Sequence, residues 1–352
     1  MSISRNALLR GTVGIAVSVV AIWILIQSVN IEAAFDVLRT ASPAWIAVML
    51  MTATIDVGAR GARWQALLKP IARIPYRRVV GYTYIGYLAN NVLPARLGEL
   101  YRSHSLGEGE GVSRTTVLGT VVVERVVDTV MVVAIAALAV VVLSVRGVMS
   151  SAVLLGLAFV SLLVIGLGLG MAAHRLPGAG RVAEIIARWP RVLELARRLR
   201  EGLAVAGKPR TLVAALAFSA LAWAASTGTF LAAGQAVGVE LSLAQAALLT
   251  SGVALVTIIP SGPGYVGTFE LTVVGIAEGF GISRDDAFAL GLLVHIVILA
   301  TTSIGGVIAM VAMRRRRDEA GTAAASEEAA AVVNGGTGSS QSPGQPRDAG
   351  RG

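Results

Sequence analysis

Two apolar segments of this chain are broken by clusters of proline, glycine and glutamate that recur about 170 positions apart. Each cluster is followed by a Gly-(Val/Ile)-Ser-Arg tetrad and then by an apolar run that contains an ionisable residue. The landmarks keep one register, since Pro263 follows Pro94 by 169 positions and Gly281 follows Gly111 by 170. This register predicts a duplicated unit, so the chain has to fold as two related halves.

The composition indicates that the duplicated unit lies in a membrane. Of the 352 residues, 55% are hydrophobic and 14% are charged, and the mean hydropathy is +0.73. Six apolar runs approach the ~20 residues that cross a ~30 Å hydrocarbon core. They cover residues 11–29, 43–58, 116–143, 150–172, 211–233 and 286–310. We therefore expect an all-α polytopic membrane protein with about six full transmembrane helices.

The two interrupted stretches, residues 79–106 and 241–280, are apolar but contain helix-breaking prolines and glycines. A broken backbone is not tolerated against lipid, because its polar groups find no partner there. The breaks must therefore face protein or a wet cavity. We predict a re-entrant hairpin for each stretch, which a hydropathy count would read as one or two further spans.

The lysines and arginines are distributed unevenly between the connections. With the N-terminus in the cytoplasm, 23 of the 30 fall in cytoplasmic segments, and only Arg39, Arg146 and Arg284 fall outside. This bias predicts that both termini are cytoplasmic. The two halves, residues 43–143 and 211–310, then have opposite orientations. Inverted repeats with broken helices near the membrane midplane are typical of secondary transporters, which bind substrate at the breaks.

Two further regions are predicted on the cytoplasmic side. Residues 175–210 place apolar and arginine residues at helical spacing, which indicates a basic amphipathic helix on an anionic leaflet or a linker packed on the bundle. Residues 314–352 are rich in Ala, Gly, Ser and Glu, which predicts a disordered tail. The membrane domain is thus expected to cover residues 1–313.

The residue types that several chemistries need are scarce. The chain has no cysteine and three histidines, which removes thiolate metal sites and cysteine nucleophiles. It contains no HExxH, GxSxG, Walker or Asp-x-Asp motif, and no group of histidines and carboxylates at metal spacing. We expect no metal, no cofactor and no enzymatic activity. The net charge of +9 does not indicate nucleic-acid binding, because the lysines and arginines are concentrated in the predicted cytoplasmic connections.

Charged residues beside the breaks are the first candidates for substrate contact. Arg96 and Glu99 lie at the first break, and Glu270 follows the second. An arginine beside a helix start suits an anionic head group. Its guanidinium group binds phosphate with two hydrogen bonds, and the unpaired backbone N–H groups of the helix N-terminus add a favourable dipole. The alternative is a structural pair of Arg96 and Glu99 that pins the hairpin. The glycines and prolines could likewise only shape the turns.

Glu124, Arg125 and Asp128 form the densest charged group within a span. Arg125 and Asp128 can pair at i, i+3, whereas Glu124 and Asp128 share a helix face and both ionise only beside a cation. The group indicates an amine-bearing substrate or proton coupling, or else a self-neutralising cluster that holds helices together. His295 lies at the matching depth of the second half, and we interpret it as an interhelix hydrogen-bonding residue, with a proton relay as the alternative.

The run at residues 43–58 is followed by charged and aromatic residues. Arg63 and Trp64 are interpreted as an anchor at the membrane interface, and Asp56 can pair with Arg60 at i, i+4. The alternative is an entry site for head groups on the cytoplasmic face.

Three strings of the sequence resemble a known family. They are NNVLPARLGELYR at residues 90–102, VVERVVD at 122–128 and PSGPGYVGTFE at 260–270. Over about residues 10–313 the chain resembles the lysylphosphatidylglycerol synthase transmembrane family, the flippase-like domains of aminoacyl-phosphatidylglycerol resistance proteins. The resemblance implies a membrane domain that moves aminoacylated phosphatidylglycerol to the outer leaflet, while a separate soluble domain makes the lipid. We expect a stand-alone member without that synthase domain.

The leading hypothesis is a lipid flippase or scramblase of the bacterial inner membrane that moves an anionic or aminoacylated phospholipid. The alternatives are an accessory or catalytic subunit acting on polyprenyl-phosphate-linked sugars, and a secondary carrier of a small soluble solute. The expected partners are membrane lipids, polyprenyl phosphate among them, and a separate lipid synthase or glycosyltransferase; a homo-oligomer is compatible with the sequence. The predicted substrate-binding residues are Asn90, Asn91, Pro94, Arg96, Gly98, Glu99, Arg102, Glu124, Arg125, Asp128, Ser261, Gly262, Pro263, Gly264, Gly267, Glu270 and His295.

Overall fold

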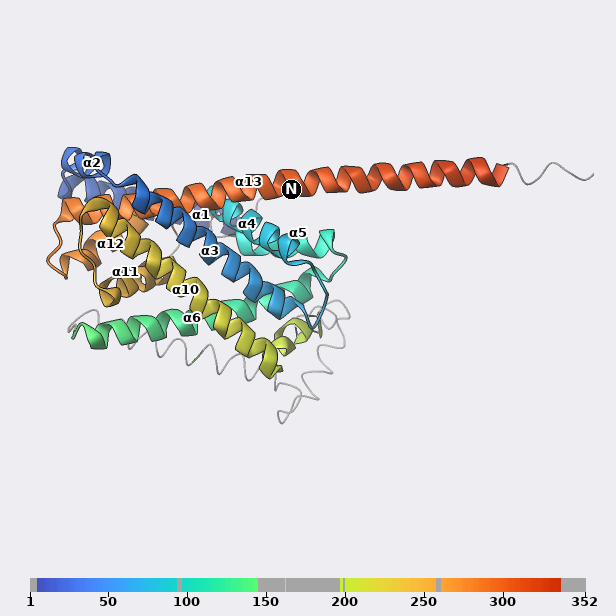
Figure 1. Cartoon of the computed structure of the whole chain (residues 1–352), viewed down its shortest axis with the longest axis horizontal. Helices are drawn as coiled ribbons and strands as arrows, with labels where there is room; N and C mark the ends of the chain where they lie inside the picture. The colour runs from blue at the N-terminus through green and yellow to red at the C-terminus, as the bar shows by residue number, and fades with distance from the viewer. Residues whose placement is uncertain are drawn as a thin grey trace, which may run out of the picture. The chain divides into compact units, whose positions relative to one another are not determined.

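The structure is a computed structural model that describes residues 5–93, 97–144, 162, 197–198, 200–257 and 261–336. The described residues form helices and connections without strands, as Figure 1 shows. The chain divides into two compact units, Met1–Val307 and Ile308–Gly352. The predicted all-α polytopic membrane fold is confirmed. The predicted span at residues 150–172 and most of the loop at 175–210 lie outside the described residues.

The helices from α3 onward repeat one order of long, medium, short and long among the described residues. The first set is α3 (Pro43–Leu68), α4 (Tyr76–Val92), α5 (Gly98–Gly109) and α6 (Arg114–Val142). The second set is α10 (Pro209–Val237), α11 (Leu243–Val256), α12 (Thr268–Glu278) and α13 (Arg284–Gly336). Each break predicted from the sequence falls between the second and third helices of its set. The helix order therefore matches the predicted duplication.

Local sequence signals account for the helix ends. Pro43 and Pro209 stand in the first turns of α3 and α10, where a missing backbone N–H costs nothing. Ser242 forms a capping box with Gln245 at the start of α11. Gly238 ends α10 in a left-handed conformation with φ of 75°, which glycine adopts without strain.

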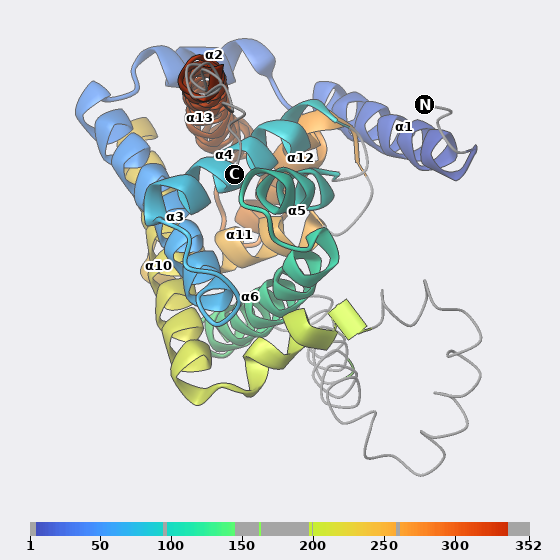
Figure 2. The same ribbon diagram turned by 90° about the vertical axis from the view of Figure 1, so that its right-hand side faces the viewer.

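The long helices α3 and α10 lie side by side and run antiparallel. The backbone N–H of Ser42 donates to the carbonyl of Ala236 at 3.0 Å, near the start of α3 and the end of α10. In the middle, the hydroxyls of Thr52 and Thr229 lie 2.9 Å apart. Both views show the two helices along each other (Figure 1, Figure 2). An antiparallel pair at the equivalent position of each set is what an inverted repeat requires.

Each interrupted stretch folds as two helices packed against each other. In the first hairpin, a Cβ atom at Gly98 would lie 2.0 Å from the carbonyl oxygen of Gly86, so only glycine permits this approach of α4 and α5. In the second hairpin, Gly252 of α11 packs against Ile276 of α12. The hairpin helices lie in the centre of Figure 2, with α3, α6 and α10 around them. The 14 residues of α11 are too few to span a membrane alone.

Three helices of the described chain are long and apolar enough to cross a membrane: Arg114–Val142, Pro209–Val237 and Arg284–Arg316. They contain the predicted spans at 116–143, 211–233 and 286–310 except for residue 143. A fourth span results if α1 (Arg5–Ser28) and α2 (Ile31–Arg39) count as one, although the chain bends by 87° between their apolar parts. The predicted span at 43–58 is the first part of α3, which carries charged residues from Asp56 onward. The cytoplasmic position of the termini stays a prediction.

The end of α13 differs from the sequence prediction. Disorder is predicted from residue 314, yet the structure continues as a helix to Gly336. Residues 320–332 are rich in alanine, which has the highest helix propensity, so local preference favours a helix here. Residues 337–352 lie outside the described chain.

Candidate functional site

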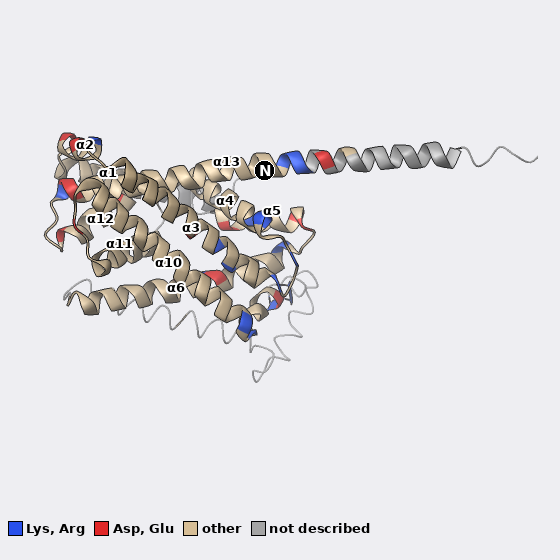
Figure 3. Cartoon of the chain, viewed as in Figure 1, with Lys and Arg blue, Asp and Glu red and all other residues tan. Residues whose placement is uncertain are grey.

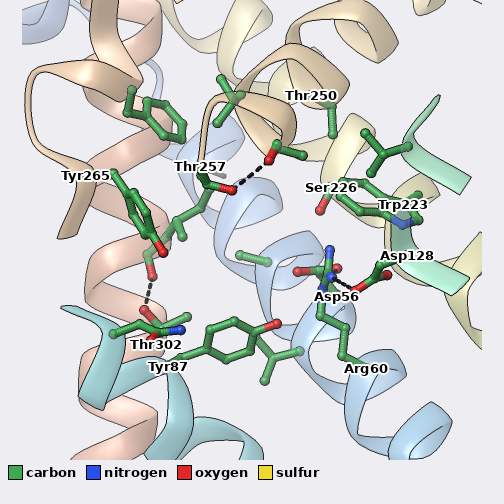
Figure 4. A pocket seen from close by; sticks show the side chains of 18 of the residues that line it. Asp56, Arg60, Tyr87, Asp128, Trp223, Ser226, Thr250, Thr257, Tyr265 and Thr302 are labelled. Atoms are coloured by element: carbon green, nitrogen blue, oxygen red, sulfur yellow. Dashed lines mark hydrogen bonds and ion pairs between the residues drawn. The ribbon is translucent and has the colours of Figure 1, made fainter. Parts of the chain in front are cut away.

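A cavity of about 600 Å³ opens inside the bundle and is lined by both halves of the chain. Its walls come from α3, α4, α5, α6, α10, α11, α12 and α13, and from residues 264–265 at the tip of the second hairpin. Most of the lining is apolar, and the polar groups lie in two regions. Figure 4 shows Asp56, Arg60, Asp128 and Trp223 on one side, and Tyr265, Thr257 and Thr302 on the other. The volume falls in the range of ordinary small-molecule sites.

Ion pairs between α3 and α6 hold one side of the cavity. Both terminal nitrogens of Arg63 contact the carboxylate of Asp128, and Nη2 also lies 3.0 Å from Glu124 Oε1. Arg63 and its neighbour Trp64 are fully buried, and Trp64 Nε1 donates to Thr120 at 3.1 Å. The prediction of an interfacial anchor is therefore wrong. The carboxylates of α6 stand opposite this turn of α3 and draw Arg63 into the bundle.

One carboxylate oxygen of Glu124 accepts hydrogen bonds from three guanidinium groups. Arg102 and Arg125 each place Nη2 at 2.8 Å from Glu124 Oε1, in addition to Arg63. The predicted pair of Arg125 and Asp128 forms at 3.3 Å. The first hairpin thus reaches the charged group through Arg102 of α5.

Two further acids and one further arginine complete the group. Arg60 Nε lies 2.8 Å from Asp56, as the i, i+4 spacing predicts, and Arg60 also reaches Asp128 at 3.4 Å. Glu99 lies 3.9 Å from Arg125. The resulting arginine–carboxylate cluster consists of Asp56, Arg60, Arg63, Glu99, Arg102, Glu124, Arg125 and Asp128.

The cluster balances four positive side chains against four negative ones when all are ionised. The cation that Glu124 and Asp128 need is therefore supplied by the protein, in agreement with the self-neutralising alternative. Other charged positions are scattered along the tan helices of Figure 3, many of them near helix ends. A buried network of this kind ties helices together, because removing one partner leaves another charge uncompensated.

Only part of the cluster faces the cavity. Asp56, Arg60, Glu99, Arg125 and Asp128 line it, whereas Arg63, Arg102 and Glu124 lie behind them. The side chain of Arg125 is 37% exposed, and its Nε has no hydrogen-bond partner within the described chain. The guanidinium of Arg60 stacks 4.7 Å above the ring of Trp223. The cavity thus presents both a guanidinium and carboxylates at one end.

The other polar region is the tip of the second hairpin, which we define as residues 261–267. His295 Nδ1 lies 2.6 Å from Glu270 Oε1, and Nε2 lies 2.7 Å from the carbonyl oxygen of Gly264. Glu270 Oε2 accepts the backbone N–H of Gly267 at 2.8 Å. The interpretation of His295 as an interhelix hydrogen-bonding residue agrees with these contacts. Phe269 stacks on its ring at 4.4 Å.

A comparison with known protein families gives a match over most of the chain. The model for the lysylphosphatidylglycerol synthase transmembrane region matches residues 11–306. The chain belongs to this family. A search of curated proteins found no match.

In this member of the lysylphosphatidylglycerol synthase transmembrane family, the three strings that carried the resemblance converge on the cavity. The string at 122–128 contributes Arg125 and Asp128 of α6 to the lining. The described residues of the string at 90–102 end α4 and begin α5, and those of the string at 260–270 include the tip of the second hairpin. Asn91 donates to Thr302 and Ser303 at 2.9 and 3.0 Å and so joins α4 to α13. Asn90 accepts the N–H of Gly98 at 2.8 Å and closes the first hairpin.

The structure brings together only some of the predicted substrate-binding residues. The cavity is lined by Asn90, Asn91, Glu99, Arg125, Asp128, Gly264 and His295. Behind the lining, or turned from it, are Gly98, Arg102, Glu124, Ser261, Gly262, Pro263, Gly267 and Glu270. Pro94 and Arg96 lie outside the described residues, so the predicted pair of Arg96 and Glu99 does too.

Sequence reasoning missed several lining residues of this family member. Asp56 and Arg60 are expected from the sequence as an i, i+4 pair but are not among the predicted substrate-binding residues, and neither are Tyr87, Trp223 and Tyr265. The spacing of aromatic and hydroxyl residues on apolar helices does not distinguish cavity-lining positions from packed ones, because the same residues pack in any membrane core. The charges of Asp56 and Arg60 on an apolar helix are the signal that could have marked them, because an ionisable residue within a span is a candidate for a functional site.

Proposed function

We propose that this protein moves a lipid head group between the two leaflets of a membrane, as a flippase or scramblase for an anionic or aminoacylated phospholipid. The observation that carries the proposal is the cavity, which combines long apolar walls with a charged end inside a bundle of membrane-spanning helices. A polar head group and attached acyl chains require this combination. Membership of the lysylphosphatidylglycerol synthase transmembrane family supports it.

The charged end offers contacts for both parts of an aminoacylated head group. Arg125 presents a partly exposed guanidinium, which suits a phosphate oxygen. Asp56 and Asp128 line the same end and suit an ammonium group. Because the cluster is already neutral, a ligand with both charges can exchange partners with it without leaving a net buried charge.

The two halves support a mechanism of alternating access. The long helices α3 and α10 pack antiparallel along the wall, and each half supplies one hairpin. Rocking of one half against the other would open the charged end to one leaflet and then to the other, as in transporters built from inverted repeats. The acyl chains would stay in the bilayer while the head group crosses.

Leaflet exchange in proteoliposomes tests the proposal. Purified protein is reconstituted with fluorescent phosphatidylglycerol, lysyl-phosphatidylglycerol or, as a neutral comparison, phosphatidylcholine, and label in the outer leaflet is quenched chemically. The Arg125→Gln variant is expected to slow exchange of the anionic lipid. The Arg39→Gln variant is the matched control, because Arg39 lies on α2, is exposed and pairs only with Asp36 among the described contacts.

Other results would point to the alternatives. Exchange that is equal for all lipids and unchanged in Arg125→Gln would contradict recognition at the charged end. Uptake of a soluble solute without lipid movement would favour a solute carrier. Movement or turnover of a polyprenyl phosphate, with phospholipids left in place, would favour the isoprenoid-linked pathway.

A further inference from the structure

The contacts of His295 restrict where protons can lie. The carbonyl oxygen of Gly264 can only accept, so Nε2, 2.7 Å away, must carry a hydrogen. The contact of 2.6 Å between Nδ1 and Glu270 Oε1 must then also contain a hydrogen. Either Glu270 is protonated and donates to a neutral imidazole, or an imidazolium donates to a carboxylate. In both cases the pair holds one shared proton in addition to the hydrogen on Nε2.

Loss of the shared proton makes the two contacts incompatible. A neutral imidazole has one N–H, and it would face two acceptors, the carboxylate of Glu270 and the carbonyl of Gly264. If the hydrogen stays on Nε2, the lone pair of Nδ1 faces a negative carboxylate. If it moves to Nδ1, the bond to Gly264 is lost. Release of one proton to the cavity therefore breaks one of the two contacts.

The tip of the second hairpin depends on these contacts. Gly264, Tyr265 and Gly267 have φ of 65°, 61° and 85°, a conformation that is strained for tyrosine. The tip is held by His295 at Gly264, by Glu270 at Gly267, and by Ser18 of α1, which accepts the N–H of Gly262 at 2.9 Å. Strained backbone of this kind persists only when its surroundings hold it.

Among the described residues, few other ionisable groups face the pair. Among the helices around it, α11 has none, α1 has none after Arg10, and α10 has only Arg210. The end of α12 carries Glu278, and the first turn of α13 carries Arg284, Asp285 and Asp286. Helix α4 carries Arg77, Arg78 and four tyrosines. Along the cavity the ionisable residues are Tyr87, Tyr265, Asp56, Arg60, Glu99, Arg125 and Asp128. The charged ones belong to the balanced cluster, so among the described lining residues the pair is the candidate for proton exchange.

We propose that Glu270 and His295 form a proton-binding site, and that release of its shared proton frees the tip of the second hairpin. His295 and residues 264–265 line the cavity, so the proton exchanges with the space that opens there. The site goes beyond the proposed lipid movement, because proton binding and release there would couple a proton gradient to the transport of any substrate that the cavity holds. It also stands without that proposal, because proton binding is measured without a substrate.

Spin labelling of the tip tests the proposal on the full chain in nanodiscs. The chain has no cysteine, so Val266→Cys gives a single attachment site at an exposed position of the tip. The nitroxide at residue 266 is expected to change from immobilised to mobile as the pH rises. The same label at Val92→Cys, exposed at the first hairpin, is the matched control and is expected to show no such transition.

The Glu270→Gln variant keeps the contacts but cannot lose the proton. Its amide can donate to Nδ1 while its oxygen accepts from Gly267, so the label at residue 266 is expected to stay immobilised at every pH. Glu278→Gln, at the partly exposed end of the same helix and outside the cavity lining, is expected to keep the transition. A transition that survives in Glu270→Gln, or that is missing from the parent protein, would overturn the proposal.

Histidine NMR gives a second measurement that needs no substitution in the pair. Three histidines give three imidazole spectra after ¹⁵N labelling, and variants of His104 and His174 assign that of His295 by difference. Nε2 of His295 is expected to be protonated on the low-pH side of the transition, and the Nδ1 signal is expected to change over the same pH range as the spin label. An unprotonated Nε2 on the low-pH side would contradict the site, whatever the lipid assay shows.

Discussion

Arg102 Nη2 lies 2.8 Å from Glu124 Oε1, so the second helix of the first hairpin is joined to the following long helix by a buried ion pair. The second half repeats this relationship with other residues, because Glu270 of α12 contacts His295 of α13 at 2.6 Å. Glu124 and His295 stand 171 positions apart, close to the register of the repeat. Each hairpin is thus fastened by an acid–base contact, but the first is balanced by several arginines and the second by a single proton.

Removing Arg63 is expected to destabilise the bundle. Arg63→Leu leaves Asp128 and Glu124 buried with fewer partners, and breaking a buried pair costs about 3–5 kcal/mol. Thermal unfolding in detergent measures the loss. The control is Arg78→Leu, whose partly exposed pair with Glu110 is worth about 0–1 kcal/mol. Equal losses in the two variants would show that the cluster does not hold α3 to α6.

Adding one methyl group at Gly98 is expected to open the first hairpin. A Cβ atom there would lie 2.0 Å from the carbonyl of Gly86 and 2.5 Å from Asn90 Oδ1, so α4 and α5 have to separate. Gly98→Ala should lower the unfolding temperature in detergent. Gly275→Ala in α12 is the matched control, because nothing lies within 4 Å of its added Cβ and alanine favours a helix by about 1 kcal/mol. A tolerated Gly98→Ala would mean that the helices are farther apart than described.

A disulfide tests the antiparallel packing of α3 and α10. The hydroxyl oxygens of Thr52 and Thr229 are 2.9 Å apart, so cysteines at both positions should cross-link under mild oxidation. The natural chain has no cysteine to interfere. The pair at residues 54 and 229 is the control, because Thr54 is exposed and donates to Leu50 of its own helix. Cross-linking of the control alone would place another face of α3 against α10.

Filling the cavity is expected to stop lipid movement without unfolding the protein. Ser226 lines the cavity on α10, and Ser226→Trp places an indole into the path of the head group. Leaflet exchange in proteoliposomes should fall to the rate of protein-free vesicles. Leu221→Trp is the control on the exposed face of the same helix. Exchange that persists in Ser226→Trp would mean that the head group takes another route.

Much of the framework was predictable from local signals. The periodic landmarks predicted two halves, and the breaks at Pro94 and Pro263 marked the hairpins, because proline and glycine act on the backbone wherever the chain goes. The pairs of Asp56 with Arg60 and of Arg125 with Asp128 followed from helical spacing alone. Such features depend on neighbours within a few residues.

The partners of Arg63 and Glu270 could not be predicted in this way. Arg63 looked like an interfacial anchor, since a charged residue beside a tryptophan near the end of an apolar run has that meaning in most membrane helices. The sequence does not contain the rotation of α3 about its axis, which decides whether Arg63 meets solvent or Asp128. That rotation is set by packing across several helices at once.

The sequence by itself determined the membrane class and the family and predicted the duplication with its two breaks, because each depends on residue type and spacing along one chain. Only the tertiary structure decided that Glu124 is neutralised by three arginines from three helices, and that His295 holds the second hairpin through Glu270 and Gly264. These contacts join residues 25 or more positions apart in most cases. They form because apolar faces of different helices match in shape and are buried together. The spacing of residues along one helix does not predict which faces pack together.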